Sequence, residues 1–310
     1  MESIERHTTV PPESKRMRRG PAFWNELRKS RWAYAFISPF YILFAIFGLW
    51  PMAFSIYLSL TQWKGVGPME FVGIEHYTRL INDTVFWQSM RNGIILFVLY
   101  VPIMLFLALV LAVILNSGRV RGFRIFRTII FMPFITNMIA AGFAFRILFT
   151  QQNGLINILF GYAGIEPVPW LESIWGARVS LSILITWAWL GYNMVIMMAG
   201  LQTISKDLTE AALVDGATPV QAFFRITIPL MRPVILFTAI TSTIGSFGLF
   251  AEIAALTGGG PMNATITPLV RIYNVAFGGL RLGYASAMAY TYFAIIFFLT
   301  IFQFRFGRER

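Results

Sequence analysis

The sequence contains no cysteine, only two histidines and few charged residues. Without cysteine the chain can form no disulfide, thiol nucleophile or cysteine-ligated metal site. The histidines, His7 and His76, fall in different polar segments, so the sequence gives no basis for a metal site. Charged residues make up 13% of the 310 residues, against about 25% in ordinary soluble domains. With a mean hydropathy of +0.66, this composition is typical of a protein that lies in a bilayer.

The apolar residues are gathered into long windows that contain almost no charge. A transmembrane helix needs about 20 such residues, and windows of that length predict six spans. Backbone groups inside hydrocarbon must be paired within their own helix, so the expected fold is all-α and polytopic. The predicted spans are residues 34–59, 93–116, 125–149, 179–200, 233–256 and 284–304, with a tail at 1–33, a long loop at 201–232 and a C-terminal tail at 305–310.

The positive charges alternate from loop to loop. The net charge is +11, and 18 of the 25 Lys and Arg residues lie in the two tails, in the second and fourth loops or, for Arg127, just beyond the second loop, against six in the other loops. The positive-inside rule therefore predicts that both termini and the 201–232 loop are cytoplasmic. This pattern is explained by membrane topology rather than by nucleic-acid binding. In the N-terminal tail, Phe23, Trp24 and Leu27 next to basic residues predict an interfacial helix, although a simple topology anchor explains the same residues.

The 201–232 loop carries two helix-start signals separated by a glycine. Asp207 and Glu210 have the spacing of a capping box, which predicts a short helix from Leu208. Gly216 is the residue type that commonly ends a helix in the left-handed conformation. Thr218, followed by Pro219 and Gln221, then predicts a second helix start.

The two acidic residues of this loop differ in how local physics explains them. Capping would be a sufficient role for Glu210. Asp215 lies at a helix C-terminus, where a carboxylate is disfavoured by about 0.3–1 kcal/mol, and no cation lies three or four residues away. Ala211 and Ala212 leave a small-residue surface on which another backbone could approach. These features together favour a rigid elbow that docks on another protein.

The loop sequence EAALVDGATPVQAFFRITIP at 210–229 resembles the EAA loop of permease subunits of ATP-binding-cassette importers. Three further segments, FVGIEHYTRLINDTVFW at 71–87, LTGGGP at 256–261 and GYASAMAY at 283–290, are similar to carbohydrate-uptake permeases of the maltose and glycerol-phosphate type. The resemblance extends from the first span to the last. One departure is His76, which stands where the family usually has Asn.

The resemblance implies a role and a set of partners. It implies that the chain is half of a translocation pathway in a prokaryotic cytoplasmic (inner) membrane, surrounded by lipid. The implied partners are a second permease subunit, two ATPase subunits and an extracytoplasmic solute-binding protein, with ATP and Mg used by the ATPase and no cofactor bound by this chain. The residues implied to meet the ATPase are Glu210, Ala211, Ala212, Asp215 and Gly216.

An ion-coupled carrier and a membrane-embedded enzyme are the alternatives to an importer subunit. A phosphate-binding loop needs a lysine between Gly and Ser or Thr, and none of the four lysines has this context, so this chain is not expected to hydrolyse ATP. An ion-coupled carrier usually buries charged relays in its spans, whereas Glu252 is the only carboxylate in the six predicted spans. A membrane-embedded enzyme would need a catalytic constellation at one depth, and none is visible.

Polar and small residues inside the spans are candidates for a solute route. In the fifth predicted span, five of them follow helical spacing and would share one face, which either packs against another helix or lines a water-filled path. Hydroxyl, amide and aromatic groups elsewhere would suit a sugar. The pathway candidates are Asn137, Tyr192, Asn193, Thr238, Thr241, Gly245, Gly248, Glu252, Ser286 and Tyr290.

Overall fold

A computed structural model describes residues 30–118 and 121–308. The chain divides into two compact units, residues 1–54 and 55–310. The predicted interfacial helix around Trp24 lies outside the described residues. Within the described ranges, five helices are long and apolar enough to cross a membrane, and a bent helix pair would make a sixth. The all-α, polytopic fold is therefore confirmed.

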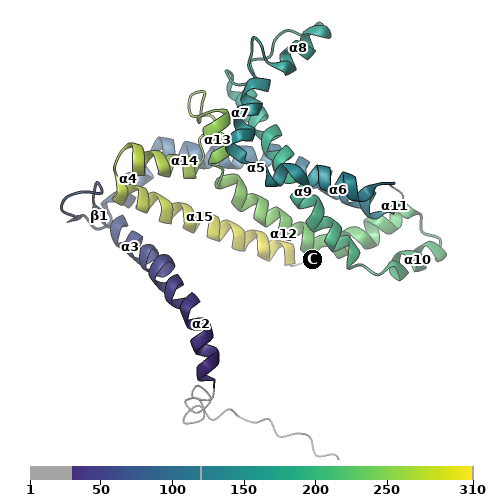
Figure 1. Ribbon diagram of the computed structural model, residues 1–310, viewed down its shortest axis with the longest axis horizontal. Helices are drawn as coiled ribbons and strands as arrows, with labels where there is room; N and C mark the ends of the chain where they lie inside the picture. Colours follow the sequence, from purple (N-terminus) through teal and green to yellow (C-terminus); the bar gives the residue numbers. More distant parts are fainter. Residues whose placement is uncertain (1–29, 119–120, 309–310) are drawn as a thin grey trace, which may run out of the picture. The chain divides into compact units, whose positions relative to one another are not determined.

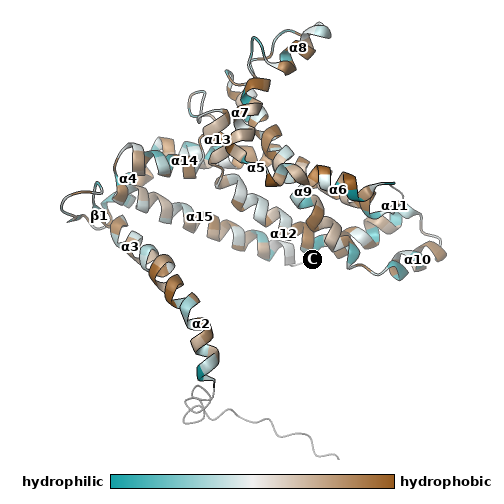
Figure 2. Ribbon diagram, viewed as in Figure 1, coloured by the Kyte–Doolittle hydropathy of each residue, from teal (hydrophilic) through white to brown (hydrophobic). Residues whose placement is uncertain are grey.

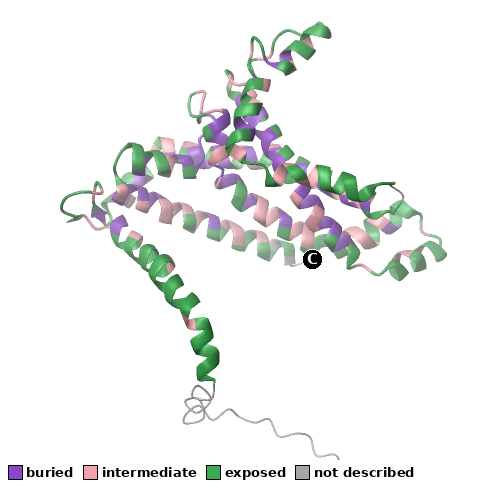
Figure 3. Cartoon of the chain, viewed as in Figure 1, coloured by how far each residue is buried: buried purple, intermediate pink, exposed green. Residues whose placement is uncertain are grey.

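The described part of the first unit is a continuous helical run. Helix α2 (Arg31–Phe44) continues through the π-helical segment η1 (Ala45–Leu49) into α3 (Trp50–Ser59), whose last residues belong to the second unit. Its large apolar side chains are exposed, as the green ribbon of α2 in Figure 3 shows. A helix that exposes apolar residues on all sides is stable only in lipid or against a partner chain.

A small hairpin and a helix follow α3. Strands β1 (Thr61–Gln62) and β2 (Glu70–Phe71) pair antiparallel, with Thr61 opposite Phe71, and α4 (Glu75–Ile81) follows them. The carbonyl of Thr61 is bonded to Nε2 of His76 at 2.9 Å, and a Cβ on Gly283 would collide with the same carbonyl. Glycine at position 283 thus lets the last span begin in direct contact with this hairpin.

Four long helices form the body of the second unit (Figure 1). Helices α5 and α9 run in the same direction, because Arg178 bonds Asn92 near their starts and Gln202 lies 3.5 Å from Asn116 near their ends. We call the end that holds these starts and the hairpin the hairpin end, and the opposite end the α10 end. The four helices are α5 (Thr84–Asn116), α9 (Ile174–Gln202), α12 (Ile228–Phe247) and α15 (Leu282–Arg308).

The predicted third span at 125–149 is not one helix. Helix α6 (Phe123–Phe131) runs into a 3-10 turn, η2 (Met132–Ile135), and α7 (Met138–Leu148) leaves at an angle of 97°. Pro133 lacks the N–H needed to continue a helix. Asn137 then starts a new one, because its Oδ1 accepts from the backbone N–H groups of residues 139 and 140 at 2.9 and 3.2 Å. Helix α6 exposes four large apolar residues, Phe123, Ile125, Phe126 and Ile129, as well as Arg124 and Arg127; Figure 2 colours its ribbon by the hydropathy of each residue.

The predicted fifth span at 233–256 is also wrong as a single helix. A continuous helical run begins earlier, with α11 (Pro219–Ala222) and the π-helical η3 (Phe223–Thr227), and ends with α12 at Phe247. After three residues the chain forms a separate short helix, α13 (Ala251–Leu256). A Cβ on Gly142 of α7 would lie 2.5 Å from that of Ala255, so α13 and α7 pack with their backbones close together. The two broken spans therefore support each other.

The remaining elements connect the spans at their ends. Helix α8 (Leu155–Tyr162) lies between α7 and α9, whereas α14 (Pro268–Tyr273) and the π-helical η4 (Asn274–Gly278) lead into α15. The second and fourth spans start earlier than predicted, at residues 84 and 174, because the residues before each charge-free window, including Arg91 and Arg178, are also helical.

Candidate functional site

A cavity of about 300 Å³ lies where α12 breaks. It is bounded by α5, α9, α12 and the first turn of α13, so residues from four elements meet there. Six of the ten predicted pathway residues line it, namely Tyr192, Asn193, Thr241, Gly245, Gly248 and Glu252. The prediction that Glu252 continues the face of the fifth-span helix was wrong, because it stands on α13, but the break still brings it to the same cavity.

The other four pathway candidates lie outside this cavity, and each has a local explanation or a different neighbour. Asn137 is the N-cap of α7. Thr238 is fully buried and donates to the carbonyls of Val234 and Ile235 on its own helix. Tyr290 pairs with the hydroxyl of Ser55 at 2.7 Å, and Ser286 is half-buried near it on α15.

One wall of the cavity is aromatic. The ring of Phe134, from the turn η2, stacks on Tyr192 with centroids 4.7 Å apart and meets Trp189 edge to face at 5.2 Å. The approach depends on Gly191, where a Cβ would collide with the carbonyl of Ile130. The bend in the third span thus fixes two rings of the cavity wall.

The polar atoms of the cavity are rich in hydrogen-bond acceptors. Glu252 is 7% exposed, and within the described residues its carboxylate forms no hydrogen bond or ion pair. Asn193 is 2% exposed; its Nδ2 donates to the carbonyl of Trp189 at 3.0 Å, whereas its buried Oδ1 has no partner. The Thr241 hydroxyl already donates to its own helix, which leaves its oxygen as an acceptor. Such a lining is suited to a solute that carries hydrogen-bond donors.

Sequence reasoning missed half of the lining. Tyr100, Met104 and Trp189 lie within apolar runs, where an aromatic or Met residue carries no signal of its position. Tyr100 is held by a 2.7 Å hydrogen bond to Ser246 on α12. The full set of missed lining residues is Tyr100, Met104, Trp189, Ser242, Ile244 and Leu249.

A buried polar network secures the loop that follows the broken span. We call residues 257–267 the GGGP loop; it includes a cis peptide bond before Pro261. Asn92 donates to the carbonyls of Asn263 and Ile266 at 2.7 and 3.0 Å and accepts from Arg178, whose Nε donates to the carbonyl of Ala264. The loop in turn holds the helix break, since the hydroxyl of Thr267 donates to the carbonyl of Leu249 at 2.6 Å.

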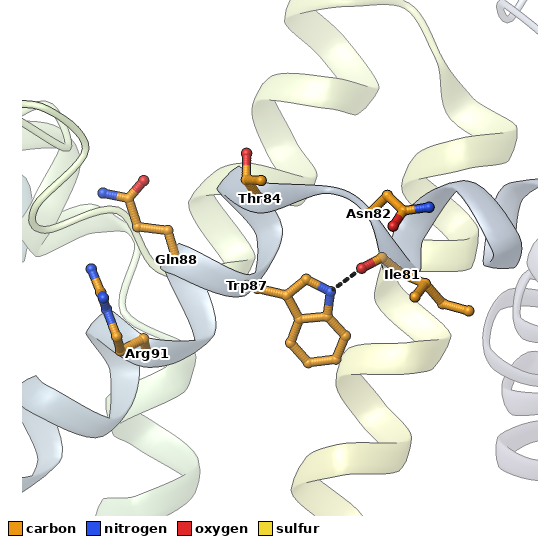
Figure 4. A pocket seen from close by; sticks show the side chains of 6 residues that line it. All are labelled: Ile81, Asn82, Thr84, Trp87, Gln88 and Arg91. Atoms are coloured by element: carbon orange, nitrogen blue, oxygen red, sulfur yellow. Dashed lines mark hydrogen bonds between the residues drawn. The ribbon is translucent and has the colours of Figure 1, made fainter.

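A second cavity, of about 700 Å³, opens at the hairpin end at the start of α5 (Figure 4). Trp87 stands in it and donates its indole N–H to the carbonyl of Ile81 at 3.0 Å. Gln88 follows Trp87 directly on α5 and Arg91 lies one turn further along the same helix (Figure 4); Gln88 also bonds the GGGP loop at Met262. The cavity is lined by Ile81, Asn82, Thr84, Trp87, Gln88 and Arg91.

Asp83 joins the starts of α5 and α15. Its carboxylate caps α5 through the N–H of Phe86 and accepts from Tyr284 at 2.8 Å and from Arg271 at 3.1 Å. Burial alone would raise the pKa of Asp83, but the bonds from Phe86, Tyr284 and Arg271 together outweigh burial and lower it from its usual value.

The loop at the α10 end forms the predicted elbow, with one correction. Helix α10 (Lys206–Val214) begins two residues earlier than predicted, because Ser205 is its N-cap and accepts from the N–H of Asp207. Asp207 and Glu210 therefore form no capping box. Glu210 is exposed and forms no side-chain hydrogen bond or ion pair within the described part of the chain.

The C-terminus of α10 follows the prediction. Gly216 has φ +88°, and the N–H groups of Gly216 and Ala217 bond the carbonyls of Leu213 and Ala212 at 3.1 and 2.9 Å. This pairing is the Schellman motif. Thr218 and Gln221 form the predicted reciprocal capping box.

The surface of α10 is open to solvent. Asp215 and Ala211 are exposed, and Ala212 is half-buried. Among the described residues, no group of His, Cys, Asp or Glu side chains is arranged to hold a metal. The elbow holds the five predicted coupling residues, and the cavity at the break of α12 holds six of the ten predicted pathway residues.

A bundle of broken apolar spans around a polar cavity, with an exposed elbow at one end, defines a multi-pass membrane transport protein. Residues 92–309 match the family model for the binding-protein-dependent transport system inner membrane component, and the chain belongs to this family. It is thus a permease subunit of an ATP-binding-cassette importer, and the family is one of transporter membrane subunits.

Relatives support this membership along nearly the whole chain. The chain is 40% identical over 279 residues to the lactose transport system permease protein LacF of Rhizobium radiobacter, covering 89% of this chain and 93% of that protein. It is 33% identical to the arabinooligosaccharides transport system permease protein AraP of Halalkalibacterium halodurans, covering 87% and 85%. A crystal structure of a bacterial alginate ABC transporter in complex with an alginate pentasaccharide-bound periplasmic protein has the same fold, with a TM-score of 0.80, 21% identity, and 92% and 97% of the two chains covered.

Proposed function

We propose that the chain imports a carbohydrate or a related polyol through the cavity at the break of α12. Support comes from the relatives, whose names assign them to lactose and arabinooligosaccharides. The lining agrees with this class, because Glu252 and Asn193 offer acceptors to hydroxyl groups while Tyr192 and Trp189 offer aromatic faces. Binding sites for small molecules usually combine such apolar walls with a few convergent polar groups.

The chain acts together with a second permease subunit, two ATP-binding-cassette ATPase subunits and an extracytoplasmic solute-binding protein. The family description names dependence on a binding protein, and a structural neighbour is in complex with a periplasmic one. ATP and Mg are used by the ATPase subunits. The charge distribution favours cytoplasmic termini and a cytoplasmic α10 end in a prokaryotic inner membrane.

Helix α10 is the element that couples to the ATPase. This assignment rests on the surface of α10, which lies outside the spans and exposes apolar side chains and carboxylates that nothing else in the described chain covers or pairs. Val214 is 88% exposed, Leu208 and Leu213 are also exposed, and neither Glu210 nor Asp215 has an ion-pair partner among the described residues. Exposed apolar side chains with unpaired carboxylates between them suit an apolar cleft of a partner protein that carries Lys or Arg side chains.

Transport then proceeds by alternating access. Closure of the ATPases on ATP moves α10, and the bundle changes from one of two packings to the other, so that the cavity accepts solute from the binding protein. Hydrolysis resets the inward-facing packing. The ligand and the nucleotide can bias this equilibrium only through their different affinities for the two states.

Substitution of Gly216 by valine tests the coupling role. Valine disfavours a φ of +88°, so the substitution should disturb the backbone of the elbow. Because no atom lies within contact of a Cβ at this position, the substitution should cause no clash elsewhere in the chain. We expect Gly216→Val to insert and fold normally, but to lose co-purifying ATPase and solute-stimulated ATP hydrolysis.

Gly164→Val is the matched control, because Gly164 also has a positive φ of +73° and open space, but follows α8. This control should keep both properties. Normal co-purification and hydrolysis in Gly216→Val would show that α10 is not the coupling element. Uptake into vesicles driven by an imposed ion gradient, with no ATPase present, would instead favour the rival function of an ion-coupled secondary carrier.

A further inference from the structure

The cavity at the break of α12 contains one formal charge. Of its lining residues only Glu252 carries a carboxylate, and no Lys, Arg or His lines the cavity. Its carboxylate also forms no hydrogen bond or ion pair within residues 30–118 and 121–308, although the residue is only 7% exposed. Because no described side chain of this chain compensates the carboxylate, we infer that water or the donors of a bound solute do so.

A purely structural role does not account for Glu252. It lies in the first turn of α13, where a carboxylate favours the helix, but α13 has only six residues and no side-chain cap. A residue that served only this helix could point to solvent. Instead, Glu252 shares the cavity with Asn193 Oδ1, which is likewise an acceptor without a partner.

We propose that Glu252 is a specificity-determining residue that admits neutral, hydroxyl-bearing saccharides and rejects saccharides that carry a carboxylate. This inference rests on the proposed function. Sugar hydroxyls donate to the Glu252 carboxylate and to Asn193. A carboxylate on the solute would meet the charge of Glu252 in a cavity largely shielded from bulk solvent, where like charges repel more strongly than they do in water.

The contrast with a structural neighbour makes the proposal specific. A transporter with a TM-score of 0.77 and 21% identity is described as importing alginate, an acidic polysaccharide. The fold therefore accommodates an anionic solute, so whatever this chain adds to the choice of solute depends on the side chains of its cavity. Among the lining residues of this cavity the one formally charged group, Glu252, is negative.

The test measures binding of two probes of similar size, lactose and lactobionate, to the assembled transporter containing the full-length chain. Lactobionate carries a carboxylate that lactose lacks. For the wild type we expect lactobionate to bind at least about tenfold more weakly than lactose, because of charge repulsion in the cavity.

Two substitutions separate charge from shape. In Glu252→Gln, which keeps size and acceptor oxygen, the preference for lactose should fall to about twofold or less. In Glu252→Asp, which keeps the charge, the preference should remain even if both probes bind more weakly. Glu172→Gln is the matched control, because Glu172 is exposed in the loop before α9, and it should keep the wild-type preference.

The outcomes distinguish failure of the role assigned to Glu252 from failure of the proposed function. Lactose binding with the same preference in wild type and Glu252→Gln would overturn the role of Glu252 and leave the proposed function intact. Equal binding of lactose and lactobionate by the wild type would also overturn the role of Glu252 and leave the proposed function intact. Failure of both lactose binding and stimulation of ATP hydrolysis by any sugar would overturn the proposed function, and this inference with it.

Discussion

Replacement of Asn92 by alanine should release the GGGP loop from α5. Asn92 is fully buried and forms three hydrogen bonds, two to loop carbonyls and one from the guanidinium of Arg178. Neutral bonds contribute about 0.5–1.5 kcal/mol each and a bond to a charged group about 1.5–3 kcal/mol. The substitution should therefore cost about 3–6 kcal/mol, because Arg178 also stays buried with only the carbonyl of Ala264 as acceptor.

Hydrogen exchange of the purified protein measures this loss locally. The N–H groups of Ala264, Thr265 and Ile266 are bonded within the loop, so they exchange only when it opens. A loss of 3 kcal/mol corresponds to about 100-fold faster exchange. Asn116→Ala is the control, because Asn116 is exposed near the end of the same helix and its contact with Gln202 is 3.5 Å long. Unchanged loop exchange in Asn92→Ala would refute the assigned role of the network.

Two further predictions concern stability. Because the pKa of Asp83 is lowered in the folded protein, the ionised Asp83 carboxylate stabilises the folded state above about pH 4, its unfolded pKa, and this stabilisation is lost as pH falls through the folded pKa. The difference in Tm between wild type and Asp83→Asn should therefore shrink from pH 6 to pH 3. A difference that stays constant over this range would contradict the assignment. Gly191→Ala should destabilise by about 1–3 kcal/mol through its clash with the Ile130 carbonyl. Gly161→Ala, in open space on α8, should be neutral or stabilising; equal unfolding midpoints for the two glycine variants would refute the close approach of α6 and α9.

Local signals in the sequence predicted what depends on a few neighbouring residues. The capping box of Thr218 with Gln221 and the left-handed Gly216 involve contacts within five residues, and both were predicted. The N-terminus of α10 was mistaken because Ser205 and Asp207 are both good N-caps, and only the folded loop decides between them. Asn137 carried a usable signal, since a residue type that caps helices, four residues after Pro133, already indicates that a helix restarts.

Long-range arrangements were not accessible from the sequence. The cavity exists because α12 stops at Phe247 and Thr267 holds the break, and this contact joins residues 18 apart. Tyr100 reaches the cavity from another helix, 146 residues away from its partner Ser246. Hydropathy finds the spans because it sums over about 20 residues, but the same sum conceals breaks of three or four residues within a span.

The short connections on either side of α10 determine its mechanical stiffness. Residues 203–205 join it to α9, and residues 215–218 join it to α11 and so to α12. Since a residue extends at most about 3.6 Å, and both connections are already folded into turns, little slack remains. A displacement of α10 by several ångströms must therefore move α9 and α12 together, because neither connection is long enough to absorb it.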